Sequence, residues 1–109
     1  MGNTWVTDIR HFLDSEGNVI REPRPARLLA QYFCLIIEAV TGRPAHRQDG
    51  STGVQCRRRP GHKPCEGIII ADFYEQDAAT IVWSCCGHLC GDNGYIRGWQ
   101  ETQWDNRLR

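Results

Sequence analysis

A chain of 109 residues is long enough for one domain but leaves room for only a thin hydrophobic core. Its 13 basic and 13 acidic residues cancel, so the overall charge indicates no polyanionic partner. No apolar run is long enough to cross a bilayer, and the first residues lack the charged head and apolar stretch of a secretory signal. We therefore expect a cytoplasmic protein with no membrane partner.

The chain opens with the signals of a β-hairpin. Aromatic and β-branched residues predict a strand over 5–13. The polar and glycine-containing segment 14–18 predicts a turn, and Val19 and Ile20 could begin a short return strand.

One long helix is expected over about 25–41. Pro25 suits its first turn, and Gly42 follows as a stop signal. Apolar residues cover a wide arc of this helix, which favours a buried core helix and leaves dimerisation through the helix open. Cys34 lies alone in it, and we assign this cysteine to packing.

The second half of the chain predicts a β-sheet. We expect a polar loop over 43–53, strands over 67–74 and 79–85 that form an antiparallel hairpin, a turn over 92–94 and a strand over 95–99. Together with the helix, these elements predict an α+β fold, in which an antiparallel sheet carries one main α-helix.

Cysteine is concentrated in this second half. Five of the six cysteines lie there, with a histidine between the last two: Cys56, Cys65, Cys85, Cys86, Cys90 and His88. We expect one domain, 1–109, with a cysteine-rich metal-binding half over about 54–104. In a reducing compartment such a cluster indicates a metal site more often than disulfides. Thiolate and imidazole are ligands that Zn²⁺ takes in closed tetrahedral sites.

The predicted hairpin would bring several of these cysteines together. Cys65 comes just before one strand and Cys85 ends the next, so the two positions should meet at one end of an antiparallel pair. The glycine-flanked turn that follows can fold Cys90 back to the same point. Cys56 completes the set if the loop between it and Cys65 doubles back.

The spacing leaves the ligand set partly open. Eight residues separate Cys56 from Cys65, more than the two to four usual in structural zinc sites. Successive side chains of an extended chain point in opposite directions, so we expect only one of Cys85 and Cys86 to ligate. The preferred metal ligands are Cys56, Cys65, Cys86 and Cys90 around a structural Zn²⁺, with Cys85 and His88 as substitutes.

Other uses of the cysteines stay open at this point. Secretion would favour three disulfides, four thiolates would also suit an iron–sulfur cluster, and free thiols would need no partner. A thiol redox or metal-handling protein could use Cys85, Cys86 and Cys90, although the chain has no Cys-x-x-Cys pair. The redox alternative requires a reactive thiol of low pKa.

The loop between Cys56 and Cys65 is strongly basic. It holds no acid and four cationic side chains: Arg57, Arg58, Arg59 and Lys63. Guanidinium groups can bind phosphates or other anions in a bidentate way, so this loop is the candidate anion or nucleic-acid contact. The neutral net charge favours instead a solvated loop whose arginines pair with acids.

Four segments carry a resemblance to known proteins: Trp5-Val-Thr-Asp-Ile-Arg-His-Phe-Leu-Asp14, Cys56-Arg-Arg-Arg-Pro-Gly-His-Lys-Pro-Cys65, Cys90-Gly-Asp-Asn-Gly94 and Gly98-Trp99. They resemble a group of small uncharacterised bacterial proteins, over about residues 5–105. No activity is attached to that group, so the resemblance implies no catalytic residues. The Cys-Gly-x-x-Gly ending is similar to the knuckle of zinc-ribbon domains, although the first two cysteines stand further apart than in a usual ribbon.

No catalytic constellation is present in the sequence. It contains no evident Ser/His/Asp arrangement, phosphate loop or paired-carboxylate site. We therefore expect a non-enzymatic binding or adaptor module with a zinc-ribbon-like knuckle and a structural zinc. Nucleic-acid binding through the arginine loop and thiol redox chemistry are the alternatives. A protein partner, and the choice between monomer and dimer, stay open.

Overall fold

The computed structural model describes residues 4–43, 50–58, 63–85 and 91–108. Within these residues it has one long helix, five strands and short 3-10 turns at Ile9–Phe12 and Asn106–Leu108. The elements are β1 (Thr4–Asp8), α1 (Arg24–Thr41), β2 (Ser51–Gln55), β3 (Ile68–Tyr74), β4 (Asp77–Cys85) and β5 (Asn93–Arg97). One main helix packed on a mostly antiparallel sheet confirms the predicted α+β fold.

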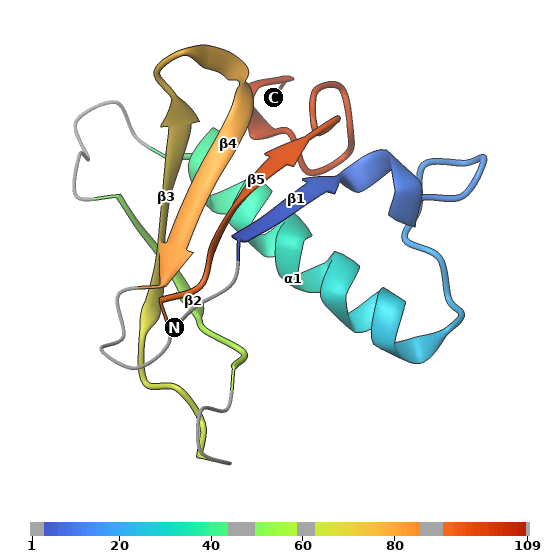
Figure 1. Cartoon of the computed structure of the whole chain (residues 1–109). Coiled ribbons are helices and arrows are strands. Elements are labelled where there is room, and N and C mark those ends of the chain that lie inside the picture. Colours follow the sequence, from blue (N-terminus) through green and yellow to red (C-terminus); the bar gives the residue numbers. More distant parts are fainter. Residues whose placement is uncertain (1–3, 44–49, 59–62, 86–90, 109) are drawn as a thin grey trace.

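The five strands form one sheet in the order β1-β5-β4-β3-β2 (Figure 1). The neighbours from β5 to β2 pair antiparallel, whereas β1 joins β5 in parallel at one edge, with Trp5 opposite Gly94. A Cβ on Gly94 would lie 2.7 Å from the Trp5 carbonyl oxygen and 2.8 Å from Trp83 Nε1. Only glycine therefore lets β1 and the Trp83 indole approach β5 so closely.

Helix α1 lies across one face of the sheet (Figure 1). The residues that it buries recur at helical spacing: Ala30, Phe33, Cys34, Ile36, Ile37, Val40 and Thr41. They pack on a sheet face that contributes Ile69, Ala71, Ile81, Trp83 and Ile96. Burying each large side chain stabilises the fold by about 1.5–3 kcal/mol, so this layer is the main source of stability. Cys34 is 3% exposed, which confirms its assignment to packing.

The first predicted strand, over 5–13, is shorter than expected. β1 ends at Asp8 because the Asp8 carboxylate accepts a hydrogen bond from the Arg10 backbone N–H at 3.0 Å and caps a 3-10 turn. The turn at 14–18 is present, but the return strand is reduced to a single bridge between Leu13 and Val19.

Two predictions in the second half were wrong. The loop expected over 43–53 ends early, because Ser51–Gln55 form β2 and the Thr52 hydroxyl donates to the Ile69 carbonyl at 2.8 Å. The turn expected over 92–94 is instead the beginning of β5, where Asn93 and Gly94 pair with β4. Both segments are poor in β-formers, so pairing with a neighbouring strand decided their structure.

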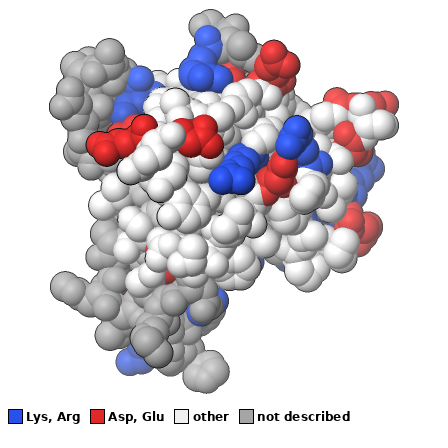
Figure 2. Space-filling model, turned by 45° about the horizontal axis from the view of Figure 1, so that its top comes forward, with Lys and Arg blue, Asp and Glu red and all other residues white. Residues whose placement is uncertain are grey.

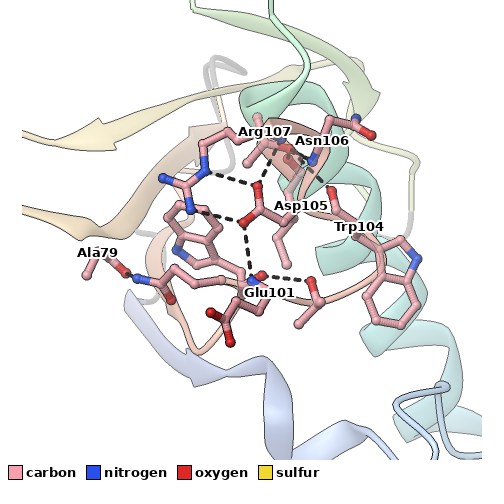
Figure 3. Close-up of polar contacts among 11 residues, drawn as sticks. Ala79, Glu101, Trp104, Asp105, Asn106 and Arg107 are labelled. Carbon is pink, nitrogen blue, oxygen red and sulfur yellow. Dashed lines mark hydrogen bonds and ion pairs between the residues drawn. The ribbon is translucent and has the colours of Figure 1, made fainter. Parts of the chain in front are cut away.

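The C-terminal segment is organised around Asp105 (Figure 3). The Asp105 side chain is fully buried, and its carboxylate accepts two hydrogen bonds from the Arg107 guanidinium, each at 3.0 Å. A third comes from the Glu101 backbone N–H at 3.3 Å. The hydrogen bonds from Arg107 lower the pKa of Asp105. The same guanidinium lies 4.4 Å from the centre of the Trp99 ring, so the Arg107 side chain covers this buried tryptophan.

This segment also caps the end of α1. The Asn106 backbone N–H donates to the Thr41 hydroxyl at 2.9 Å, and the Asn106 side-chain amide donates to the Glu38 carbonyl at 3.0 Å. The Glu38 carbonyl also accepts from the Gly42 N–H at 3.0 Å, so these bonds add a tertiary connection that holds the C-terminal segment against the last turn of the helix. A Cβ on Gly42 would lie 2.8 Å from Asn106 Nδ2, which explains the glycine at the helix end.

Candidate metal centre

Three strand ends position three cysteines. Cys56 directly follows β2, Cys65 precedes β3, and Cys85 is the last residue of β4. The register places Gln55 opposite Ile68 and Cys85 next to the beginning of β3. The expectation that an antiparallel hairpin would bring Cys65 and Cys85 to one end of the sheet is confirmed.

The three sulfurs converge on one point. Their Sγ atoms all lie within 4.8 Å of one another, and those of Cys65 and Cys85 are 3.5 Å apart. Zinc–sulfur bonds of about 2.3 Å in a tetrahedron require neighbouring sulfurs to be about 3.8 Å apart. No disulfide joins Cys56, Cys65 and Cys85 to one another. Their spacing is therefore that of ligands around one ion.

Burial closes the cluster to solvent. Cys56, Cys65 and Cys85 are 5%, 6% and 8% exposed, on the sheet end that continues the hydrophobic core. A cluster of buried thiolates is costly unless a cation compensates the charge. Three buried cysteines at this distance can hold a metal ion.

Hydrogen bonds to the backbone hold Cys56 and Cys65 in place. The Cys56 N–H donates to the Gly67 carbonyl at 2.9 Å. The Gly67 N–H in turn donates to Cys65 Sγ at 3.3 Å. The Cys65 N–H donates to the Arg58 carbonyl at 2.8 Å. An N–H group directed at a sulfur stabilises its thiolate form and fixes its orientation.

An ion pair with a buried carboxylate supports the third cysteine. The Cys85 N–H donates to the Asp92 carbonyl at 2.8 Å, and the Asp92 carboxylate lies 3.0 Å from Arg58 Nε. The Asp92 side chain is only 3% exposed. Because the Arg58 carbonyl holds Cys65 and the Asp92 carbonyl holds Cys85, this ion pair connects the supports of two ligands.

The structure thus brings together two preferred ligands and one substitute. Cys56 and Cys65 lie in the cluster as expected, and Cys85 lies there as well. The other named positions, Cys86, His88 and Cys90, lie outside the described residues. These three positions lie between Cys85 and Asp92, and the Cys85 N–H donates a hydrogen bond to the Asp92 carbonyl.

Cys34 is separate from this centre and chemically quiet. Burial, with a smaller contribution from the neighbouring Glu38 carboxylate, raises the pKa of the Cys34 thiol to about 12. A thiol that stays protonated at neutral pH is a poor nucleophile and a poor metal ligand.

The arginine loop is less free than its composition suggested. Arg58 pairs with an acid, Asp92, as expected for a loop whose arginines pair with acids, and Arg57 lies 5.8 Å from the Tyr32 ring centre. Lys63 is exposed, and Arg59 lies outside the described residues. Among the described residues on the face shown in Figure 2, acidic and basic side chains are interspersed around a broad uncharged area, without a large patch of one sign.

No protein-family model, curated protein or solved structure matches this chain. Among the residues that the structure describes, no helix combines the length and apolar character needed to cross a membrane.

Proposed function

We propose that this chain is a small non-enzymatic binding or adaptor module, held at one end of its sheet by a structural Zn²⁺. The observation that carries the proposal is the convergence within 4.8 Å of three buried Sγ atoms that lie at or beside the ends of three strands. A cytoplasmic location, in which thiols stay reduced, belongs to the same proposal.

Zinc suits this donor set better than other common ions. Thiolates are soft ligands that exclude calcium and magnesium, and a tetrahedral sulfur-rich site favours zinc or iron–sulfur chemistry. The fourth ligand would come from Cys86, His88 or Cys90, because the chain between Cys85 and Asp92 begins and ends at the cluster. A zinc-ribbon-like knuckle would follow from that assignment.

The metal would act by joining strands. The three cysteines follow β2, precede β3 and end β4, so one ion would tie three of the five strands of the sheet: Cys56, Cys65 and Cys85. In a chain of 109 residues such ligation contributes directly to the free energy of folding. Four protein ligands would leave no open position for water, which makes the site structural rather than catalytic.

Metal analysis of protein purified without added zinc tests the proposal. We expect about one zinc per chain, bound zinc well below one in Cys65→Ser and Cys85→Ser, and an unchanged content in Cys34→Ala, the matched control outside the cluster. Single replacements of Cys86, His88 and Cys90 should identify one fourth ligand. A folded wild-type protein with far less than one metal ion per chain would refute the structural zinc.

Two other results would support an iron–sulfur cluster or thiol redox chemistry in place of a structural zinc. Stoichiometric iron with visible absorption would assign an iron–sulfur cluster. Rapid alkylation of the metal-loaded protein at a cluster cysteine would favour thiol redox chemistry. Nucleic-acid binding through the arginine loop has less support, because Arg58 is already paired with a buried carboxylate.

A further inference from the structure

A cavity beside the metal centre has the features of a ligand site. It measures about 260 Å³ and lies where the first half of α1 passes under β1 and β4. Its walls include four aromatic side chains, Trp5, Tyr32, Phe33 and Trp83. A cavity of about 150 Å³ lined by apolar side chains is known to hold benzene, so this one has room for about two fused rings.

Trp83 supplies part of the aromatic wall of this cavity. The residue is 4% exposed, and its ring packs edge-on against Tyr32, with the ring centres 6.2 Å apart. Its Nε1 atom lies beside Gly94, which is not among the residues that line the cavity. This wall therefore favours a ligand with planar apolar rings.

The mouth of the cavity is positively charged. Arg57 and Arg58 both line it, and Asp92 lines it with the opposite charge. Because Asp92 pairs with Arg58 at 3.0 Å, the Arg57 guanidinium supplies the remaining positive charge. Arg57 makes no ion pair with any described acid, and its position 5.8 Å from the Tyr32 ring centre keeps it at the aromatic wall.

We propose that this cavity binds a small planar aromatic monoanion, with its rings against the tryptophans and its anionic group at Arg57. The proposal rests on the proposed metal centre, because Cys56 and Cys65 bracket the loop that carries Arg57 and Arg58. Binding would give the adaptor module a small-molecule input next to its metal.

The four tryptophans allow a direct test in zinc-loaded, ¹⁵N-labelled full-length protein. Trp5 and Trp83 line the cavity, whereas Trp99 and Trp104 do not. Titration with 2-naphthoate should therefore shift the indole N–H signals of Trp5 and Trp83 in a saturable way and leave those of Trp99 and Trp104 in place. Each signal is assigned by replacing its tryptophan with phenylalanine.

The dependence of affinity on ligand charge distinguishes a specific anion site from non-specific binding to an apolar surface. The uncharged 2-naphthamide should bind about tenfold more weakly than 2-naphthoate, and Arg57→Gln should weaken 2-naphthoate by about the same factor, as expected for one charge-assisted hydrogen bond. Arg97→Gln is the matched control, because Arg97 is exposed and lies on β5 outside the cavity. Its affinity should equal that of the wild type.

Two results would overturn the proposal. One is a zinc-loaded protein whose Trp5 and Trp83 signals do not move at millimolar 2-naphthoate, or move together with Trp99 and Trp104. The other is binding that is indifferent to Arg57→Gln. The zinc content of the same sample tells this failure apart from failure of the metal centre.

Discussion

Asp92 illustrates how a residue outside the cysteine cluster can support the proposed metal centre. Its backbone carbonyl holds Cys85, and its buried carboxylate holds Arg58, whose own carbonyl holds Cys65. Loss of the charge would leave the Arg58 guanidinium without this partner and loosen both supports.

Replacing Asp92 with asparagine tests this role. We expect Asp92→Asn to lower zinc affinity by about 10–100-fold, the range typical of outer-shell substitutions, measured by competition with a chelator of known affinity. Asp72→Asn is the matched control, because the Asp72 side chain is 65% exposed and lies 3.6 Å from Arg43, away from the cluster. Equal zinc affinity in the two variants would show that the ion pair does not support the site.

The place of Cys85 in the cluster has a signal in the sequence. Ile81, Trp83 and Cys85 alternate along β4, and all three are buried on the face that meets α1. This alternation predicts that Cys85 lies on the core face of the sheet. The preference for Cys86 did not use this pattern, and Cys86 itself lies outside the described residues.

At the scale of elements, β1 and the chain that follows it depend on a carboxylate. Asp8 accepts hydrogen bonds from the Arg10 guanidinium at 2.9 and 2.6 Å and from the Arg10 backbone N–H at 3.0 Å. The guanidinium is the larger cause, and together these bonds lower the pKa of Asp8 from 3.8 to about 2.

The sign of the pH effect follows from that lowered pKa. Asp8 binds its proton less readily in the folded state, so its stabilising effect is fully present above about pH 4 and is lost as the pH falls through about 2. Asp8→Asn should therefore lower the melting temperature at pH 5, and the difference from wild type should shrink toward pH 2. Because acid releases metal from both proteins, only this difference is interpreted. A difference that stayed constant with pH would exclude the ion pair as its cause.

Local sequence signals predicted some helices and strands accurately and missed others. Helix α1 begins and ends within one residue of the expected range because Pro25 and Gly42 mark its ends. β2 escaped prediction because the sequence Ser-Thr-Gly-Val-Gln has little strand character and depends on pairing with β3. The parallel pairing of β1 with β5 joins residues almost ninety positions apart, as Thr4 and Asn93 show, and no local pattern encodes such a contact.

For the whole molecule, helix α1 and the cysteine cluster lie at different parts of one sheet. Helix α1 buries the central strands, while the cysteines lie at the end formed by β2, β3 and β4, which the proposed zinc would join. The opposite face of the sheet keeps apolar side chains in contact with solvent, with Val6 70% and Ile70 40% exposed. The overall charge is zero, so shape and apolar surface, rather than net charge, would select a partner.

X-ray absorption at the zinc edge tests the central claim most directly, because it reports the atoms bound to the metal in the purified protein. The convergence of three Sγ atoms predicts a four-coordinate zinc whose first shell is dominated by sulfur at about 2.3 Å, with one further sulfur or nitrogen. It also predicts that Cys85→Ser removes sulfur from that shell. A first shell of oxygen and nitrogen, or a zinc edge too weak for one ion per chain, would contradict a metal centre built on Cys56, Cys65 and Cys85.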